Sequence, residues 1–466
     1  MVSENIGFSK YIHNKGRFFM LVYVIIYVAL LLLIGIIDAS KIKSFDDFAV
    51  AGRKQPQTFV TLSLLATIIG ASATMGVMGR VTSLGFPAFW WLGVGSIGLL
   101  LQAFLLSERV REMDANTVPD LVTKLVGRVP SSIVAIIIII AWPGIVASQI
   151  LAMSSILALV TGRENNRTLM LIVAIIVILY TTIGGQLSVI KTDALQFIII
   201  GLAFVATFVY LFFFANGDTQ TVLSNVELLN DRYGVKELLI QLFIVGGTYL
   251  LGPDVISRNL VARDGKTARN SAIIAAVVLI FFSAIIVLTG MYITFNYADI
   301  GTMNPLIYVI KEILPMPVGV LLAIGLLSTL LSSADTCLVN ISSIIENDVL
   351  RKNRVWALRL WALIIGIIAV FIAFFKGDII AMLTGAYSVY APGIVCPLFI
   401  AIMTHKKRKL NVPLWVTATL VGGICGGLNT YVFTELTYLP ITGMGLSLIF
   451  SLLSVFFGSK IDEAEA

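Results

Sequence analysis

Cysteine, histidine and charge are all scarce in this sequence. Its 466 residues include 3 cysteines and 2 histidines, and only 12% of the residues are charged. The cysteines, Cys337, Cys396 and Cys425, lie in apolar runs without metal-ligand spacing, so we interpret them as small core residues. His13 and His405 lie near the ends of apolar runs, which leaves a histidine metal site or a catalytic triad without support. An integral-membrane enzyme is therefore disfavoured.

Long apolar runs dominate the chain instead. Hydrophobic residues make up 58% of the sequence and the mean hydropathy is +0.98, whereas soluble proteins carry about 25% charged residues. Because an apolar run of about 20 residues can cross a bilayer as a helix, we predict an all-α, polytopic membrane protein with about thirteen spans and no sizeable soluble domain. The spans are expected near residues 18–38, 57–80, 86–106, 130–160, 168–184, 187–215, 236–256, 270–295, 316–346, 355–375, 378–403, 411–433 and 438–458.

The net charge of +6 does not point to a nucleic-acid partner, because the basic residues alternate by loop. Every second predicted loop is basic, which by the positive-inside rule places those loops in the cytoplasm of a plasma-membrane protein, the N-terminus outside and the C-terminus inside. Exceptions on the predicted outside are Lys10, Lys15, Arg17, Arg163 and Arg167. The loop after the first span contains Lys41, Lys43, Arg53 and Lys54, the loop after the third contains Arg109 and Arg111, and the loop after the seventh contains Arg258, Arg263, Lys266 and Arg269. The loop after the ninth span contains Arg351, Lys352, Arg354 and Arg359, and the loop after the eleventh contains Lys406, Lys407, Arg408 and Lys409.

One apolar run, 321–345, contains an unusually dense group of oxygen-bearing side chains. On a helix, residues three and four apart share a face. The shared face carries Thr329, Ser332, Ser333 and Thr336, and Asp335 lies one turn from Ser332. Polar groups at membrane depth are costly and are commonly functional. This ladder of hard oxygens suits a small hard cation.

Two other spans are predicted to be interrupted. Residues 66–76 are small or hydroxylated with two glycines, and Gly246–Tyr249 followed by Gly252–Asp254 forms the second interruption, five spans later. Small residues in a membrane helix more often serve close packing. However, discontinuous helices at corresponding positions of two repeats are a sequence indication of a transporter's central site. Together with the ladder, the two breaks favour a binding site.

Two aspartates, Asp193 and Asp335, lie within predicted spans. A central aspartate costs roughly 2.5 to 3.5 kcal/mol even on the lenient insertion scale, so each should have a cationic partner or line water. Neither has a lysine or arginine at helical spacing on its own span, and Lys191 should point away from Asp193. A bound cation is the partner we expect.

Three stretches are similar to the sodium:solute symporter family. Residues 44–53, SFDDFAVAGR, resemble the acidic-pair, aromatic and Gly-Arg loop after its first span. Residues 180–196, YTTIGGQLSVIKTDALQ, resemble its Tyr-Thr-x-x-Gly-Gly through Thr-Asp-x-x-Gln signature. The third stretch, 329–348, contains SSADT followed by Glu-Asn-Asp.

The resemblance implies a leucine-transporter-like fold in a single transporter domain. An extra N-terminal helix at 18–38 would precede two five-helix inverted repeats at 57–215 and 236–403, and two C-terminal helices would follow at 411–458. It also implies secondary active, sodium-coupled symport of a small organic solute by alternating access, without enzymatic activity.

The resemblance assigns Na⁺, the coupling ion, to a common site. Its ligands would be backbone carbonyls of Ala66 and Ile69 and the hydroxyls of Ser332 and Ser333, with Thr329 contributing its carbonyl or its hydroxyl. Relatives often have a small apolar residue at the position of Thr329.

A second site for sodium or a proton would use Asp193, Asp335 and Thr336, together with Ser332. Asp335 stands where certain two-sodium relatives have a hydroxyl, so the number of sodium ions per cycle stays open.

The solute pocket should lie between the two breaks and the third and tenth core helices. We expect it to involve Ser63, Gln149, Thr248, Tyr249 and Tyr387, although ordinary packing is the simpler interpretation of each tyrosine. No midplane arginine or lysine is evident, which disfavours a multiply charged anion. Two alternatives stay open at this point: a proton-coupled symporter of the same fold, and a non-transporting membrane sensor.

Overall fold

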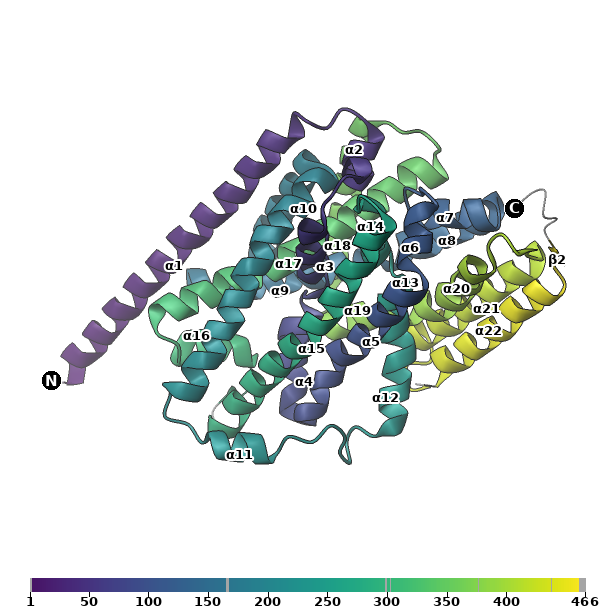
Figure 1. The fold of residues 1–466 in the computed structure, drawn as a ribbon. Coiled ribbons are helices and arrows are strands. Elements are labelled where there is room, and N and C mark those ends of the chain that lie inside the picture. The colour runs from purple at the N-terminus through teal and green to yellow at the C-terminus, as the bar shows by residue number, and fades with distance from the viewer. Residues whose placement is uncertain are drawn as a thin grey trace.

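The computed structural model describes residues 2–164, 167–297, 300–301, 303–375, 377–436 and 438–460, with side chains from residue 18 onward. Residues 461–466 and the side chains of Lys10, Lys15 and Arg17 lie outside this description. Nearly all of the regular structure is helical, as the sequence predicts (Figure 1).

The first half of the chain contains eleven α-helices. They are α1 (Val2–Ala39), α2 (Phe45–Val50), α3 (Gln57–Ile68), α4 (Val77–Leu84), α5 (Trp90–Leu105), α6 (Ser107–Glu112), α7 (Val118–Leu125), α8 (Arg128–Ala141), α9 (Pro143–Thr161), α10 (Arg167–Phe213) and α11 (Thr219–Ser224). Short 3₁₀ turns lie at Ala51–Arg53 and Phe86–Phe89, and a π-helical turn lies at Ser72–Gly76.

The second half contains eleven further α-helices and one small sheet. The helices are α12 (Val235–Gln241), α13 (Gly247–Leu251), α14 (Pro253–Val261), α15 (Gly265–Asn296), α16 (Pro305–Glu312), α17 (Met316–Ile344), α18 (Val355–Phe375), α19 (Ile379–Tyr390), α20 (Cys396–Thr404), α21 (Val412–Tyr431) and α22 (Leu439–Phe456). Further π-helical turns lie at Leu242–Gly246, Ile345–Val349 and Ala391–Val395. Strands β1 (Arg408–Lys409) and β2 (Ser459–Lys460) pair antiparallel.

The number of membrane-crossing segments depends on how two bent elements are counted. Among the described residues, 11 helices are long and apolar enough to cross a membrane, or 12 if the bent pair of Gln57–Ile68 and Ser72–Leu84 is one span. Helix α10 has 47 residues, about 70 Å of helix, against a hydrocarbon core of about 30 Å. The expected thirteen spans are reached when α10 is counted as two.

Gly185 divides α10 between the two predicted spans. Its φ of 53° and ψ of −170° are not helical, and this left-handed conformation favours glycine. A Cβ at this position would lie 2.7 Å from the ring of Phe48. The Phe48 ring of α2 therefore packs directly on the α10 backbone, which brings the first two family-like stretches into contact.

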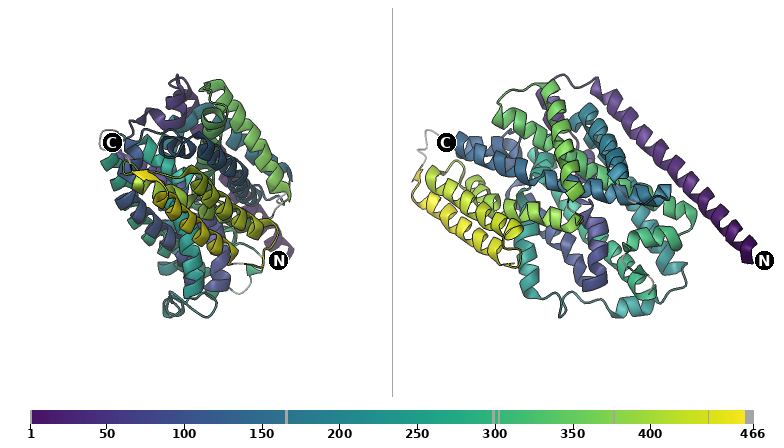
Figure 2. Two further views of the ribbon diagram at one scale, coloured as in Figure 1. Left: turned by 90° about the vertical axis from the view of Figure 1, so that its right-hand side faces the viewer. Right: turned by 180° about the vertical axis from the view of Figure 1, so that it is seen from behind.

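Helices α10 and α17 pack along each other in the centre of the molecule, and α3 and α9 contact both of them. Helix α1 lies along α10 at one edge of the molecule, whereas α21 and α22 pair at the opposite edge (Figures 1 and 2). The ladder residues on α17 are consequently buried on all sides.

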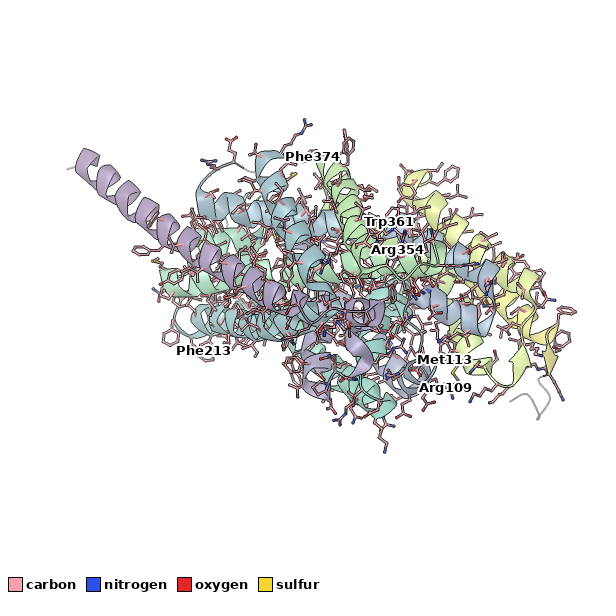
Figure 3. The ribbon with its side chains drawn as sticks, turned by 90° about the horizontal axis from the view of Figure 1, so that it is seen from above. Arg109, Met113, Phe213, Arg354, Trp361 and Phe374 are labelled. Atoms are coloured by element: carbon pink, nitrogen blue, oxygen red, sulfur yellow. The ribbon has the colours of Figure 1, made fainter. Side chains whose placement is uncertain are left out.

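The basic loops meet at one end of the molecule. Arg53 lies 3.2 Å from Asp114, and Arg269 lies 2.9 Å from Glu108. Arg109, labelled with Met113 in Figure 3, donates to the sulfur of Met403. Loops that alternate along the sequence are thus on the same side, which agrees with the alternating charge pattern.

The loop after α17 is held at this same end. Arg354 Nε lies 2.8 Å from Glu346 Oε1, and Trp361 Nε1 donates to Glu346 Oε2 at 3.3 Å. Arg354 and Trp361 accordingly lie close together in Figure 3. Glu346 belongs to the third family-like stretch, and its buried carboxylate anchors the start of α18.

Candidate cation and solute site

The first predicted break lies between α3 and the following π-helical turn. Ile69 leaves the helical region, with φ −82° and ψ 75°, and the two helical segments on either side are bent by 54°. A Cβ on Gly70 would lie 2.5 Å from Ser333 Oγ and 3.2 Å from Gln149 Nε2. Glycine at this position lets α9 and α17 approach the interrupted backbone.

The second break is at Gly252. Its ψ of 146° separates α13 from α14, while Gly246 and Gly247 remain in π-helical and α-helical backbone. The interruption therefore falls at the Gly-Pro-Asp end of the stretch identified in the sequence and not at the glycine pair. π-Helical turns are frequent at functional sites, and those at Ser72–Gly76 and Leu242–Gly246 adjoin the two breaks.

The two central serines of α17 bond to the carbonyls at the end of α3. Ser332 Oγ lies 2.8 Å from the Ala66 carbonyl oxygen, and Ser333 Oγ lies 2.8 Å from that of Thr67. Both hydroxyls also approach the Thr329 carbonyl, at 3.0 and 3.1 Å. Uncharged hard oxygens thus converge from two helices, and they belong to Ala66, Thr67, Thr329, Ser332 and Ser333.

The donor set fits a sodium ion. Hard cations of low charge prefer hydroxyl and carbonyl oxygens, and both hydroxyls can turn their hydrogens away and present lone pairs. Thr329 offers its carbonyl, because its hydroxyl donates to Leu326 at 2.7 Å. The carbonyl beside Ser333 belongs to Thr67. Ile69, which the resemblance names, is buried two residues further along the broken backbone. The ligand assignment itself stays a prediction.

Arg258 lies among the residues predicted for the second site. Its Nη2 is 3.0 Å from Asp193 Oδ2 and 2.5 Å from Thr336 Oγ1, and its side chain is fully buried. The same nitrogen is 2.6 Å from Thr67 Oγ1. Two corrections follow. Arg258 is not a residue of a basic loop, and the cationic partner of Asp193 is this guanidinium.

Asp335 is buried in the same cluster and forms no ion pair within the described part of the chain. Its Oδ1 lies 3.4 Å from Thr336 Oγ1, and its Oδ2 has no hydrogen-bond partner among the described residues. Asp193 Oδ1 is likewise buried without a partner there. The cluster therefore holds two carboxyl groups and one guanidinium.

Two other predictions about this region have clear outcomes. Lys191 does point away from Asp193: it lies 2.7 Å from Asp38 Oδ1. Ser63, expected in the solute pocket, instead donates to Asp193 Oδ2 at 2.5 Å. Ser63 therefore belongs to the Arg258 cluster and does not line the central pocket described next.

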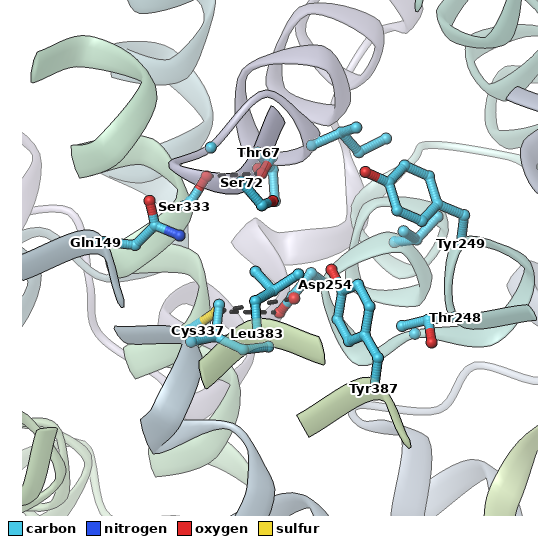
Figure 4. Close-up of a pocket in the computed structure, with 15 residues that line it drawn as sticks. Thr67, Ser72, Gln149, Thr248, Tyr249, Asp254, Ser333, Cys337, Leu383 and Tyr387 are labelled. Atoms are coloured by element: carbon cyan, nitrogen blue, oxygen red, sulfur yellow. Dashed lines mark hydrogen bonds between the residues drawn. The ribbon is translucent and has the colours of Figure 1, made fainter. Parts of the chain in front are cut away.

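A small pocket lies between the two breaks (Figure 4). Four of the five residues expected around the solute line it, namely Gln149, Thr248, Tyr249 and Tyr387. Its volume of about 30 Å³ holds little more than one or two water molecules. Solute entry therefore requires the lining helices to separate.

The pocket adjoins the serine cluster and the Arg258 cluster. Ser333 and Thr67 line it as well, and Gln149 Oε1 accepts from the Ala71 N–H at 2.9 Å. The broken backbone therefore connects the pocket to both sets of oxygens. Sequence reasoning missed Thr67, Arg258 and the pocket-lining Asp254; the last two lie just beyond the Gly-Pro break, which was the available signal.

Comparison with known proteins agrees with these features. The model of the sodium:solute symporter family matches residues 48–422. The chain is 24% identical to the sodium/proline symporter of Salmonella typhimurium, over 96% of this chain and 93% of that protein. It is 27% identical to the osmoregulated proline transporter OpuE of Bacillus subtilis, over 85% of this chain and 88% of that protein.

Solved structures share the fold at low sequence identity. A Na⁺-coupled sialic acid symporter, solved in a substrate-bound outward-open state, has a TM-score of 0.81 at 15% identity, over 95% of this chain and 98% of that one. MhsT in complex with L-phenylalanine has a TM-score of 0.55 at 17% identity, over 85% of this chain and 98% of MhsT. The predicted leucine-transporter-like fold is confirmed. Because the family model covers most of its length, the chain belongs to the sodium:solute symporter family.

Proposed function

We propose that this protein is a sodium-coupled symporter that carries a small organic solute across the membrane by alternating access. The observation that carries the proposal is the contact of Ser332 Oγ with the Ala66 carbonyl at 2.8 Å. It joins a ladder on α17 to the interrupted backbone of α3, and those oxygens are close only while the two helices touch.

Sodium would strengthen this contact and so favour the conformation that contains it, because a ligand stabilises the state to which it binds best. Ser333 lines the solute pocket and also bonds to Thr67. Binding of sodium and solute would therefore be coupled, typically by about 1 to 3 kcal/mol and in both directions. The membrane potential adds roughly 2.3 kcal/mol per charge per 100 mV.

The solute we propose is small and organic. The names of the relatives, two of them proline transporters, make L-proline the first compound to test. Gln149, Thr248, Tyr249 and Tyr387 would contact it.

Arg258 favours one sodium ion per cycle. A fixed guanidinium 3.0 Å from Asp193 occupies the position at which a second cation would otherwise balance this carboxylate. Asp335 has no ion pair and its Oδ2 has no partner in the described part of the chain, which favours the proton-coupled alternative.

The topology we propose has the N-terminus outside the cell and the C-terminus in the cytoplasm. The meeting of the basic loops at one end supports it, because basic loops are retained in the cytoplasm. We also keep the repeat boundaries 57–215 and 236–403 as a proposal, supported by one backbone break in each segment.

The test is uptake of radiolabelled L-proline and an amino-acid panel into proteoliposomes with an imposed sodium gradient. Accumulation that requires external sodium supports the proposal. Accumulation that persists without sodium and disappears when a pH gradient is dissipated would establish the proton-coupled alternative instead.

A further inference from the structure

Asp254 is the acidic side chain among the residues that line the central pocket. It lies at the second position of α14, directly after the break at Gly252. Figure 4 shows its carboxyl group and the ring of Tyr387 among the side chains that line the pocket.

Within the described part of the chain, every hydrogen bond to this carboxyl group is one that a carboxylate accepts. Trp142 Nε1 lies 3.1 Å from Oδ1 and 3.0 Å from Oδ2, and Asn340 Nδ2 lies 2.9 Å from Oδ1. The indole N–H and the amide NH₂ are pure donors. The position in the first turn of α14 also favours negative charge, because the helix dipole is positive there. These donors and the helix dipole favour the carboxylate form of Asp254.

No ion pair balances that anion within the described part of the chain. Arg258 lies one turn further along α14, but its Nη2 is 3.0 Å from Asp193 and also contacts Thr67 and Thr336. Its Nη1 is 3.2 Å from Ser257. The guanidinium is therefore engaged by Asp193 and by neighbouring hydroxyls, and no lysine or arginine lines the pocket.

Aromatic rings complete the pocket wall around the carboxylate. Tyr249 and Tyr387 line the pocket, and the ring of Trp142 lies 6.3 Å from that of Tyr387. Aromatic faces attract organic cations, whereas an anionic solute would meet the negative charge of Asp254 without compensation.

We propose that the solute carries a positively charged nitrogen and that Asp254 is its counter-ion. The inference rests on the proposed symport function and specifies its substrate class as organic ammonium compounds, zwitterionic amino and imino acids included. Sodium at the serine cluster would be bound by hydroxyl and carbonyl oxygens of α3 and α17 and not by Asp254, so solute and ion would occupy separate sites.

The test is sodium-dependent thermal stabilisation of the purified full-length protein by four probes. They are L-proline (a zwitterion), choline (a cation), myo-inositol (neutral) and lactate (an anion). We expect stabilisation by proline or choline and none by inositol or lactate. Stabilisation by inositol or lactate, or by neither ammonium compound, would overturn the inference.

Asp254→Asn keeps the shape of the side chain and removes its charge. For the ammonium compound that binds, we expect affinity to fall by at least about tenfold, as for loss of one charge-assisted contact, while stabilisation by sodium alone is retained. Asp348→Asn is the matched control: Asp348 is also a buried aspartate, bonded to Thr117 at 2.6 Å, but it does not line the pocket. An unchanged affinity in Asp254→Asn would overturn the inference.

Failure of this inference differs from failure of the proposed function. Sodium-dependent uptake of a neutral or anionic solute would leave symport intact and remove the role of Asp254. Absence of any effect of sodium on binding or uptake would instead remove the symport proposal.

Discussion

Arg258 Nη2 and Asp193 Oδ2 form an ion pair of 3.0 Å in which both side chains are fully buried. The partners come from α14 and α10, 65 residues apart in the chain. Removing one member of a buried pair leaves the other charge uncompensated, which is more damaging than removing both.

The first prediction concerns this pair. Arg258→Ala should lower the free energy of unfolding by about 3 to 5 kcal/mol, and Arg258→Ala with Asp193→Asn should lower it by less than the two single changes added together. Chemical denaturation of the four proteins measures the coupling. Arg263→Ala is the control, since its pair with Asp264 is exposed and should contribute less than about 1 kcal/mol.

The same variant tests the proposed stoichiometry. Without the guanidinium, the carboxyl groups of Asp193 and Asp335 are free to bind a second sodium ion. We expect the Hill coefficient for sodium to rise from near one in the wild type toward two in Arg258→Ala. A wild-type coefficient near two would contradict the role assigned to Arg258.

The second prediction concerns the serine cluster. Ser332→Ala with Ser333→Ala should abolish sodium-dependent solute binding while the protein stays folded. The double substitution removes both hydroxyl groups that lie against the α3 carbonyls. Binding of sodium is read by thermal shift and coupling by uptake into proteoliposomes. Ser342→Ala on the same helix is the control, since this buried hydroxyl bonds to Val339 of its own helix; unchanged sodium dependence in the double variant would refute the site.

The third prediction concerns the close approach at Gly70. In Gly70→Ala the new Cβ would lie 2.5 Å from Ser333 Oγ, so Ser333 must move away from Thr67. We expect apparent sodium affinity to fall by about tenfold, the effect of losing about 1.4 kcal/mol of binding free energy. Gly79→Ala, with nothing within 4 Å of its added Cβ, should leave sodium affinity unchanged; equal effects of both substitutions would disprove the argument.

The fourth prediction concerns the contact between α5 and the π-helical turn Leu242–Gly246. A Cβ on Gly98 would lie 2.2 Å from the Gly246 carbonyl oxygen. Because this neighbour is backbone, it cannot rotate away, and Gly98→Ala should reduce the yield of folded, monodisperse protein. The control is Gly201→Ala, whose Cβ meets nothing within 4 Å; size-exclusion profiles that match for the two variants would argue against the close contact.

The sequence by itself determined the membrane class, the spans, the break in α3 and the ladder on α17. Hydropathy and helical periodicity depend only on the identity and order of neighbouring residues, so they can be read without coordinates. The loop charges likewise predicted which segments share an end of the molecule.

Tertiary structure alone decided which oxygens and charges meet. Asp193 and Asp335 lacked a cation at helical spacing on their own spans, and the cation that pairs with Asp193 is Arg258 on another helix. Ser63, which we expected in the solute pocket, instead contacts Asp193 in the Arg258 cluster, again because of how the helices pack. Such partners are chosen by how non-adjacent helices pack, and one-dimensional spacing carries no record of that packing.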